Sequence, residues 1–123
     1  MRSAALPLLL SVTALALTGC GPTKNASYDD ADEMRQAVED ADVECGDDEQ
    51  STGQYPGTTT VMCDEKVMLT VLGSDDAERG VKDSLEELGL SYVQAGNWIA
   101  ASGYISRLEE VQEAIGGDLT RMS

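Results

Sequence analysis

The sequence predicts an α+β fold, in which a four-stranded, mainly antiparallel sheet carries three helices packed on one of its faces. Two observations predict this class. Segments with the helical spacing of apolar residues alternate with pairs of short apolar segments, and a turn separates the members of each pair. The order is therefore helix, hairpin, helix, hairpin, helix. The chain has 123 residues, the length of one small domain, and we expect that domain to span residues 29–123.

Residues 31–42 are predicted to form the first helix, because Ala31, Met34 and Val38 recur at helical spacing. Acidic residues crowd its start, where the helix dipole favours negative charge. The next segment, residues 46–57, is polar and rich in turn-forming residues, so we expect a surface loop.

Residues 58–63 and 67–72 are predicted to pair as the first hairpin. Apolar side chains occupy both faces of the second segment, which is typical of a central strand. The helix that follows has Ser74 in the N-cap position and Gly89 as a left-handed end residue. Gly80 inside this helix is expected to cost about 1 kcal/mol relative to alanine.

The second hairpin is expected over residues 91–95 and 98–102, with Gly96 and Asn97 as its two-residue turn. Trp98 opens the second strand of this hairpin. We interpret it as a core residue, because the chain has one Trp and no Phe and therefore few large side chains to fill a core. The alternative is an exposed aromatic anchor for a partner.

A third helix is expected to begin at the capping box formed by Ser106 and Glu109. Its apolar stripe runs to Ile115, and Gly116 and Gly117 then stop the helix. The remaining residues are expected to form a short tail.

Residues 1–19 are expected to be a cleaved signal peptide. A short start with one positive side chain, Arg2, precedes an apolar run over residues 4–17. That run is too short for a comfortable membrane span and is typical of a secretory signal.

The apolar run ends in Leu17, Thr18, Gly19 and Cys20. This stretch resembles the bacterial lipobox, which has an aliphatic residue, two small residues and a cysteine. The resemblance implies that a lipid is attached to Cys20 and that the chain is cut before it. Residues 20–28 are then the lipidated cysteine and a short tether, and the attached acyl chains insert in the bilayer.

The whole chain is similar to small uncharacterised lipobox lipoproteins of high-GC Gram-positive bacteria. These join a lipobox to an acidic domain stapled by cysteines, often with a hairpin like the one at Gly96, Asn97 and Trp98. The resemblance implies a lipid-anchored protein on the extracytoplasmic face of the cell membrane. It implies no activity and no cofactor.

The two cysteines of the domain, Cys45 and Cys63, form an even pair once Cys20 carries lipid. Because an exported chain enters a compartment that permits disulfides, we expect these two to be bonded. The chain-entropy estimate for closing such a loop is about 3 kcal/mol. The alternative is a pair of buried free thiols. A metal site is less favoured, because the chain has no His.

The charge balance limits the possible partners. With 23 acidic and 8 basic residues the net charge is −15, which argues against binding to nucleic acid or to anionic lipid head groups. It is compatible with basic partners. Without His, and without a nucleophile elbow or a phosphate-binding loop, the sequence contains no catalytic constellation.

A calcium site is the alternative that the acidic residues suggest. Asp40, Asp42 and Glu44 alternate like the first ligands of an EF-hand loop, but Cys45 stands where glycine is required and Ser51 where glutamate is required. A looser cluster of carboxylates remains as a hypothesis: Asp42, Glu44, Asp47, Asp48 and Glu49. We favour a solvated acidic surface, and therefore no metal.

These features favour a membrane-anchored lipoprotein with a non-catalytic binding or scaffolding role toward an unidentified envelope protein. The second hypothesis is a low-affinity calcium- or cation-binding module, and the third is an enzyme of unrecognised type. Within the domain, Tyr55, Pro56 and Gly57 are the candidates for contact with a partner.

Overall fold

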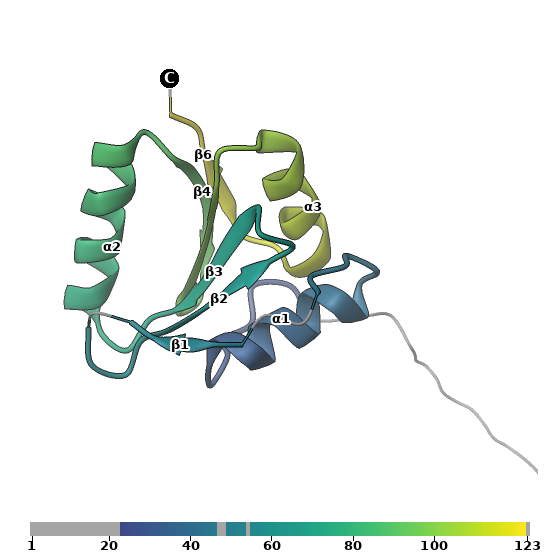
Figure 1. Cartoon of the computed structure of the whole chain (residues 1–123), viewed down its shortest axis with the longest axis horizontal. Helices are drawn as coiled ribbons and strands as arrows, with labels where there is room; N and C mark the ends of the chain where they lie inside the picture. The colour runs from purple at the N-terminus through teal and green to yellow at the C-terminus, as the bar shows by residue number, and fades with distance from the viewer. Residues whose placement is uncertain (1–22, 47–48, 54, 123) are drawn as a thin grey trace, which may run out of the picture.

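The computed structural model describes residues 23–46, 49–53 and 55–122. The predicted signal peptide, the lipobox residues Leu17, Thr18, Gly19 and Cys20, and the candidate calcium ligands Asp47 and Asp48 lie outside this part. Figure 1 shows the elements, which are α1 (Ala31–Asp40), β1 (Ser51–Thr52), β2 (Thr59–Cys63), β3 (Val67–Val71), α2 (Asp75–Leu88), β4 (Ser91–Ala95), β5 (Trp98–Ser102), α3 (Ile105–Ile115) and β6 (Asp118–Thr120).

The fold is α+β, but the predicted four-stranded sheet is wrong. The described strands form a six-stranded antiparallel sheet in the order β1-β2-β3-β5-β4-β6. The two additional strands, β1 and β6, are its edges. The sequence predicted a surface loop and a tail in these two segments, because both are short and polar and lack alternating apolar residues. Ser51 pairs with Thr60 and Thr120 with Tyr92, so each strand forms on the free edge of a neighbour.

The prediction of helices on one face is also wrong, because helices cover both faces of the sheet (Figure 1). One apolar core joins α1 and α3 to the face that carries Val61, Leu69 and Val93. A smaller core joins α2 to the opposite face, where Ile99 and Ala101 lie. The double coverage follows from strands that are apolar on both sides. As predicted, β3 is a central strand, paired with β2 and β5.

Two of the three described helices begin at a residue whose side chain caps the first turn. Asp30 caps α1 and Ser74 caps α2 through their side chains. Gly89 ends α2 with a φ of 72°, as predicted. The predicted capping box of α3 is wrong, because this helix begins after Tyr104 with no side-chain cap. The chain turns into α3 directly from β5, and the Ser102 hydroxyl accepts the Tyr104 N–H at 3.0 Å.

The predicted disulfide between Cys45 and Cys63 is confirmed. It joins the segment after α1 to the end of β2, and both cysteines are fully buried in the larger core. The Asp64 N–H also donates to the Cys45 carbonyl at 2.7 Å, so a backbone hydrogen bond supports the same junction.

Residues 24–28, here called the N-terminal strap, are hydrogen-bonded to the folded domain. The Asn25 N–H donates to the Ile115 carbonyl at 2.8 Å, at the end of α3. The Trp98 indole Nε1–H donates to the Ala26 carbonyl at 2.8 Å. Both the N–H and the carbonyl of Tyr28 bond to the side chain of Asn97, at 3.0 and 2.7 Å. The strap therefore holds to α3 and to the β4–β5 turn.

Trp98 is completely buried, which confirms the prediction that it packs in the core. Its ring fills the larger core, and its one polar atom is satisfied by the strap. Among the described residues, no helix is long and apolar enough to cross a membrane.

Candidate binding surface

An apolar groove lies between α2 and strands β2 and β3 of the sheet, with a volume of about 290 Å³. We call it the α2 groove. The residues that line it are Gly53, Tyr55, Thr58, Thr60, Met68, Thr70, Val81, Ser84, Leu85, Leu88 and Leu90. Its walls come from α2 and from the loop before β2, and its floor comes from β2 and β3.

The groove forms because α2 does not cover the whole of the sheet face on which it packs. The helix approaches the sheet over β4, where the side chain of Gln94 bonds to Glu78. On β2 and β3 the same face presents Thr60 and Thr70, whose hydroxyls lie 3.1 Å apart. Because these hydroxyls satisfy each other, the floor needs no further polar partner.

Glu78 and Lys82 lie on one edge of α2, where they are hydrogen-bonded to each other and Glu78 also bonds to Gln94 of β4. The hydrogen bond from Gln94 is the main cause that lowers the pKa of the Glu78 carboxyl, and the hydrogen bond from Lys82 lowers it further. The Lys82 ammonium lies 3.1 Å from the Glu78 carboxylate. This edge faces β4, so the opposite edge of the helix remains free to form the groove wall.

Tyr55 closes one end of the groove by packing against Gly80 in the middle of α2. A Cβ atom added at Gly80 would lie 3.0 Å from the Cε1 atom of Tyr55 and closer still to its phenol end. Only a glycine leaves room for this ring in its present position. The residue that was expected to weaken α2 is thus the residue that lets the loop dock on it.

Apolar side chains and hydroxyl groups make up most of the lining of the groove. Among its lining residues Tyr55 is the one side chain that ionises, and no carboxylate or thiol lines it. The Thr58 hydroxyl already accepts the Gly73 N–H at 3.0 Å. The polar side chains of the lining are therefore all hydroxyl groups.

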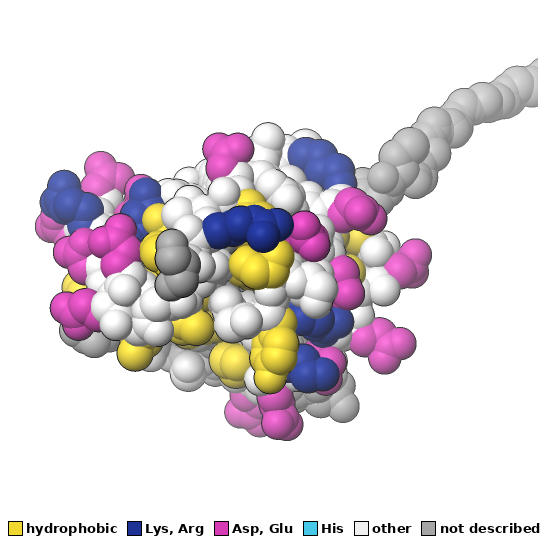
Figure 2. Space-filling model, turned by 90° about the horizontal axis from the view of Figure 1, so that it is seen from above, with side chains coloured by type: hydrophobic (Ala, Val, Ile, Leu, Met, Phe, Trp, Pro, Cys, Tyr) yellow, Lys and Arg dark blue, Asp and Glu magenta, His cyan; other side chains and the backbone are white. Residues whose placement is uncertain are grey.

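A large hydrophobic side chain is exposed at the rim of the groove. Leu88, in the last turn of α2, is 70% exposed. Glu86 and Glu87 precede it, and the last turn of α2 contains no basic residue. In the view of Figure 2, acidic side chains are spread around the outline of the molecule and hydrophobic side chains lie between them.

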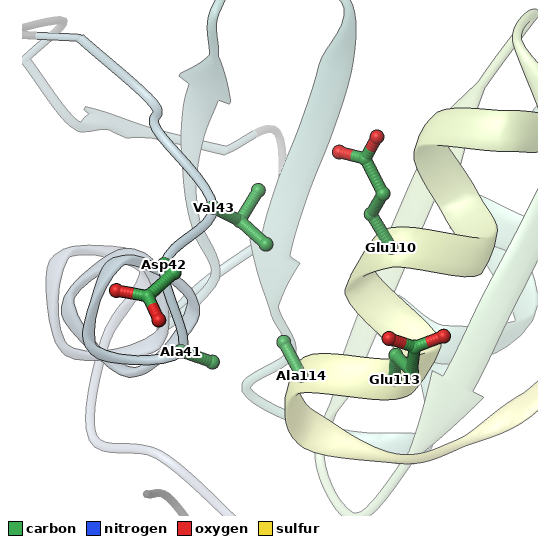
Figure 3. A pocket seen from close by; sticks show the side chains of 6 residues that line it. All are labelled: Ala41, Asp42, Val43, Glu110, Glu113 and Ala114. Atoms are coloured by element: carbon green, nitrogen blue, oxygen red, sulfur yellow. The ribbon is translucent and has the colours of Figure 1, made fainter.

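A second hollow, of about 360 Å³, separates the end of α1 from α3. Figure 3 shows Asp42 and Val43 on the segment after α1, with Glu110 and Glu113 across the hollow on α3. Within residues 23–46, 49–53 and 55–122, no three Cys, Asp or Glu side chains are grouped so that they could hold a metal ion. Asp42 lies at a hollow that Glu110 and Glu113 also line.

Tyr28, in the strap, is the other buried ionisable group of note. Burial is the main cause that raises the pKa of its phenol above the usual 10.0, and the nearby charge of Glu33 raises it further. Among the described residues its hydroxyl has no hydrogen-bond partner.

The structure changes the interpretation of the predicted contact residues. Tyr55 is half-buried against α2 rather than free on the loop, yet it does line the groove. Leu88 continues the helical spacing of the apolar residues Ala77, Val81 and Leu85 in α2, yet it is the most exposed large hydrophobic residue described. Helical periodicity places a residue on the apolar side of a helix, but it does not show how far the sheet extends beneath that side.

Comparisons of the chain with protein-family models, with curated proteins and with solved structures found no match. The resemblance to lipobox lipoproteins therefore stays a prediction made from the residues themselves.

Proposed function

We propose that this protein is a lipoprotein of the bacterial cell envelope that binds another envelope protein without catalysing a reaction. In this proposal Cys20 carries the lipid and anchors the domain to the extracytoplasmic face of the cell membrane. The observation that carries the binding role is the α2 groove, which is apolar, open and free of catalytic side chains.

Two further features support the anchored location. The first is the apolar run that ends in Leu17, Thr18, Gly19 and Cys20. The second is the buried disulfide between Cys45 and Cys63, because structural disulfides persist in oxidising compartments outside the cytoplasm.

The strap shortens the connection between lipid and domain. Lys24 donates from its ammonium group to the Ala114 carbonyl at 3.3 Å, so the domain begins to hold the chain at this residue. From Cys20 to Lys24 an extended chain spans at most about 14 Å. The proposal therefore predicts a domain held close to the bilayer, with its α3 end nearest to the lipid.

The anchor is tested by partitioning of the full-length protein between detergent and water. The wild-type protein is expected in the detergent phase and the Cys20→Ala variant in the aqueous phase. Thr18→Ala is the matched control, because it keeps a small residue two positions before the cysteine and should leave partitioning unchanged. Detergent partitioning of Cys20→Ala would contradict lipid attachment at this residue.

The binding role is tested in living cells with a photo-cross-linking residue in place of Leu88. A protein partner is expected to give one discrete adduct whose amount saturates as the protein is expressed more strongly. The same residue in place of Tyr104, which is 57% exposed and does not line the groove, serves as the control. Equal, diffuse labelling of abundant neighbours from both positions would remove the support for a specific partner.

A further inference from the structure

The N-terminal strap lies on one surface of the domain, formed by the end of α3 and the β4–β5 turn. Asn25 Oδ1 accepts the Gly117 N–H at 2.7 Å, just after α3. A Cβ atom added at Gly96 would lie 2.9 Å from the Ala26 carbonyl oxygen, and one added at Gly116 would lie 2.5 Å from Asn25 Oδ1. Two glycines therefore leave the space in which the strap lies, so the domain surface fits this segment of the chain.

Hydrogen bonds near the surface, more than buried apolar area, hold the strap in place. Lys24, Asn25 and Ser27 are exposed. Ala26 is half-buried, and Tyr28 is the one strap residue that is buried in the larger core. Water can bond to the same backbone and side-chain groups when the strap leaves, so each hydrogen bond contributes only a small net free energy to docking.

Two features of the docked strap are unfavourable. The Tyr28 hydroxyl is buried, and among the described residues it has no hydrogen-bond partner. Because water would bond to this hydroxyl after release, its burial opposes docking. Asn25 has a φ of 61°, in the left-handed region that costs free energy for residues other than glycine. The difference in free energy between the docked and the released strap is therefore small.

Helix α1, which follows the strap, is attached to the sheet by contacts of its own. The Ala31 N–H at its start donates to the Thr59 hydroxyl of β2 at 2.8 Å. The disulfide between Cys45 and Cys63 joins the segment after α1 to the end of β2. These contacts keep α1 on the sheet when the strap leaves, so the strap can open as a local unit while the domain stays folded.

We propose that the strap is a latch that sets how far the lipid anchor lets the domain move from the bilayer. With the strap docked, the free chain runs from Cys20 to Lys24 and spans at most about 14 Å. With the strap released, it runs to Asp29, whose N–H is held at 2.8 Å by Glu33 of α1. That longer stretch spans at most about 31 Å. The inference rests on the proposed function for the lipid at Cys20, and it adds a control on the reach and orientation of the anchored domain.

The first test follows exchange of the Trp98 indole N–H for deuterium by NMR, with the full-length protein in non-ionic micelles. The chain has one Trp, so a single indole resonance reports on the strap through the bond to the Ala26 carbonyl. We expect the indole proton to be protected about tenfold less than the backbone N–H groups of the central strand β3, which exchange through global unfolding. Equal protection in the wild-type protein would overturn the latch, because the strap would then open only when the whole domain unfolds.

Two variants should shift the latch in opposite directions. Tyr28→Phe removes the hydroxyl without a partner and should slow indole exchange about fivefold. Asn97→Ala removes both side-chain hydrogen bonds to the Tyr28 backbone and should speed exchange about tenfold. Tyr104→Phe removes an exposed hydroxyl outside the strap and is the matched control, with unchanged exchange. Unchanged or faster exchange in Tyr28→Phe contradicts the proposed balance, and this variant decides the result even if Asn97→Ala fails to fold.

The second test measures the distance from the domain to the membrane, in nanodiscs whose lipid head groups carry a nitroxide. The Gly117 amide lies beside the strap, so the nitroxide should broaden its resonance in the wild type, more strongly in Tyr28→Phe and more weakly in Asn97→Ala. Cys20→Ala should lose the broadening and keep wild-type indole exchange. Wild-type protein that fails to partition into detergent would refute the anchor. Normal partitioning with equal broadening in the wild type and both strap variants would refute the latch alone.

Discussion

Because Tyr55 docks on Gly80, we predict that Gly80→Ala has different effects on the free energy of unfolding in two backgrounds. It should not stabilise the wild-type protein, but it should stabilise the Tyr55→Ala variant. In an exposed helix, replacing glycine by alanine stabilises by about 1 kcal/mol, because alanine loses less backbone entropy on folding. In this protein the new methyl group would occupy the place of the Tyr55 ring, whose Cε1 atom is only 3.0 Å away. The phenol end of the ring must therefore move away from α2.

The cost of moving the ring offsets the gain in helix stability. Tyr55 packs against the core beneath α2, and returning such a half-buried ring to water costs about 1–2 kcal/mol. Gly80→Ala should therefore change the free energy of unfolding by between about zero and 1 kcal/mol in the destabilising direction. With Tyr55→Ala already in place, the same substitution should stabilise by about 1 kcal/mol.

The measurement is a double-mutant cycle by equilibrium urea denaturation, with the fluorescence of the buried Trp98 as the probe. The expected coupling energy is about 1–2 kcal/mol. A parallel cycle that replaces Tyr104 by alanine is the control and should show no coupling. If Gly80→Ala stabilised equally in the presence and absence of Tyr55, the docking of the ring would be refuted.

Two further predictions concern the strap and the disulfide. Tyr28→Phe should leave stability at neutral pH unchanged or raised, because it removes a buried hydroxyl that has no partner among the described residues. Since the pKa of Tyr28 is raised in the folded state, its contribution is fully present below pH 10.0 and is lost as the pH rises through the folded-state pKa. Denaturation midpoints across this range should fall less steeply in Tyr28→Phe, and identical slopes would contradict the assignment. The double replacement of Cys45 and Cys63 by alanine should cost about 3 kcal/mol of loop-closure free energy, and a loss below about 1 kcal/mol would show that the bond contributes little.

Strong local signals were sufficient to predict several elements from the sequence. The second hairpin has the predicted bounds, because its two-residue turn at Gly96 and Asn97 leaves one register between strands with matching apolar residues. Ser74 and Gly89 mark the ends of α2 through hydrogen bonding and backbone conformation, which are properties of the residues themselves. The disulfide was predictable because the expected domain, residues 29–123, contains two cysteines, Cys45 and Cys63, and therefore has one possible pairing.

The groove could be predicted only in part. Tyr55 was identified from the turn-rich loop around it, but its contact with α2 depends on a glycine 25 positions later in the chain. The exposed position of Leu88 depends on where α2 crosses the sheet. No periodicity in the sequence of a single helix contains that information.

The sequence by itself determined the elements whose ends and pairing depend on neighbouring residues, together with the acidic charge and the pairing of Cys45 with Cys63. It also supplied the motif at Cys20 on which the predicted location depends. The tertiary structure alone decided the edge strands β1 and β6, the placement of α2 opposite α1 and α3, and the groove that results. These features arise when the free edges and exposed faces of one element are covered by segments distant in the chain, so no local pattern specifies them.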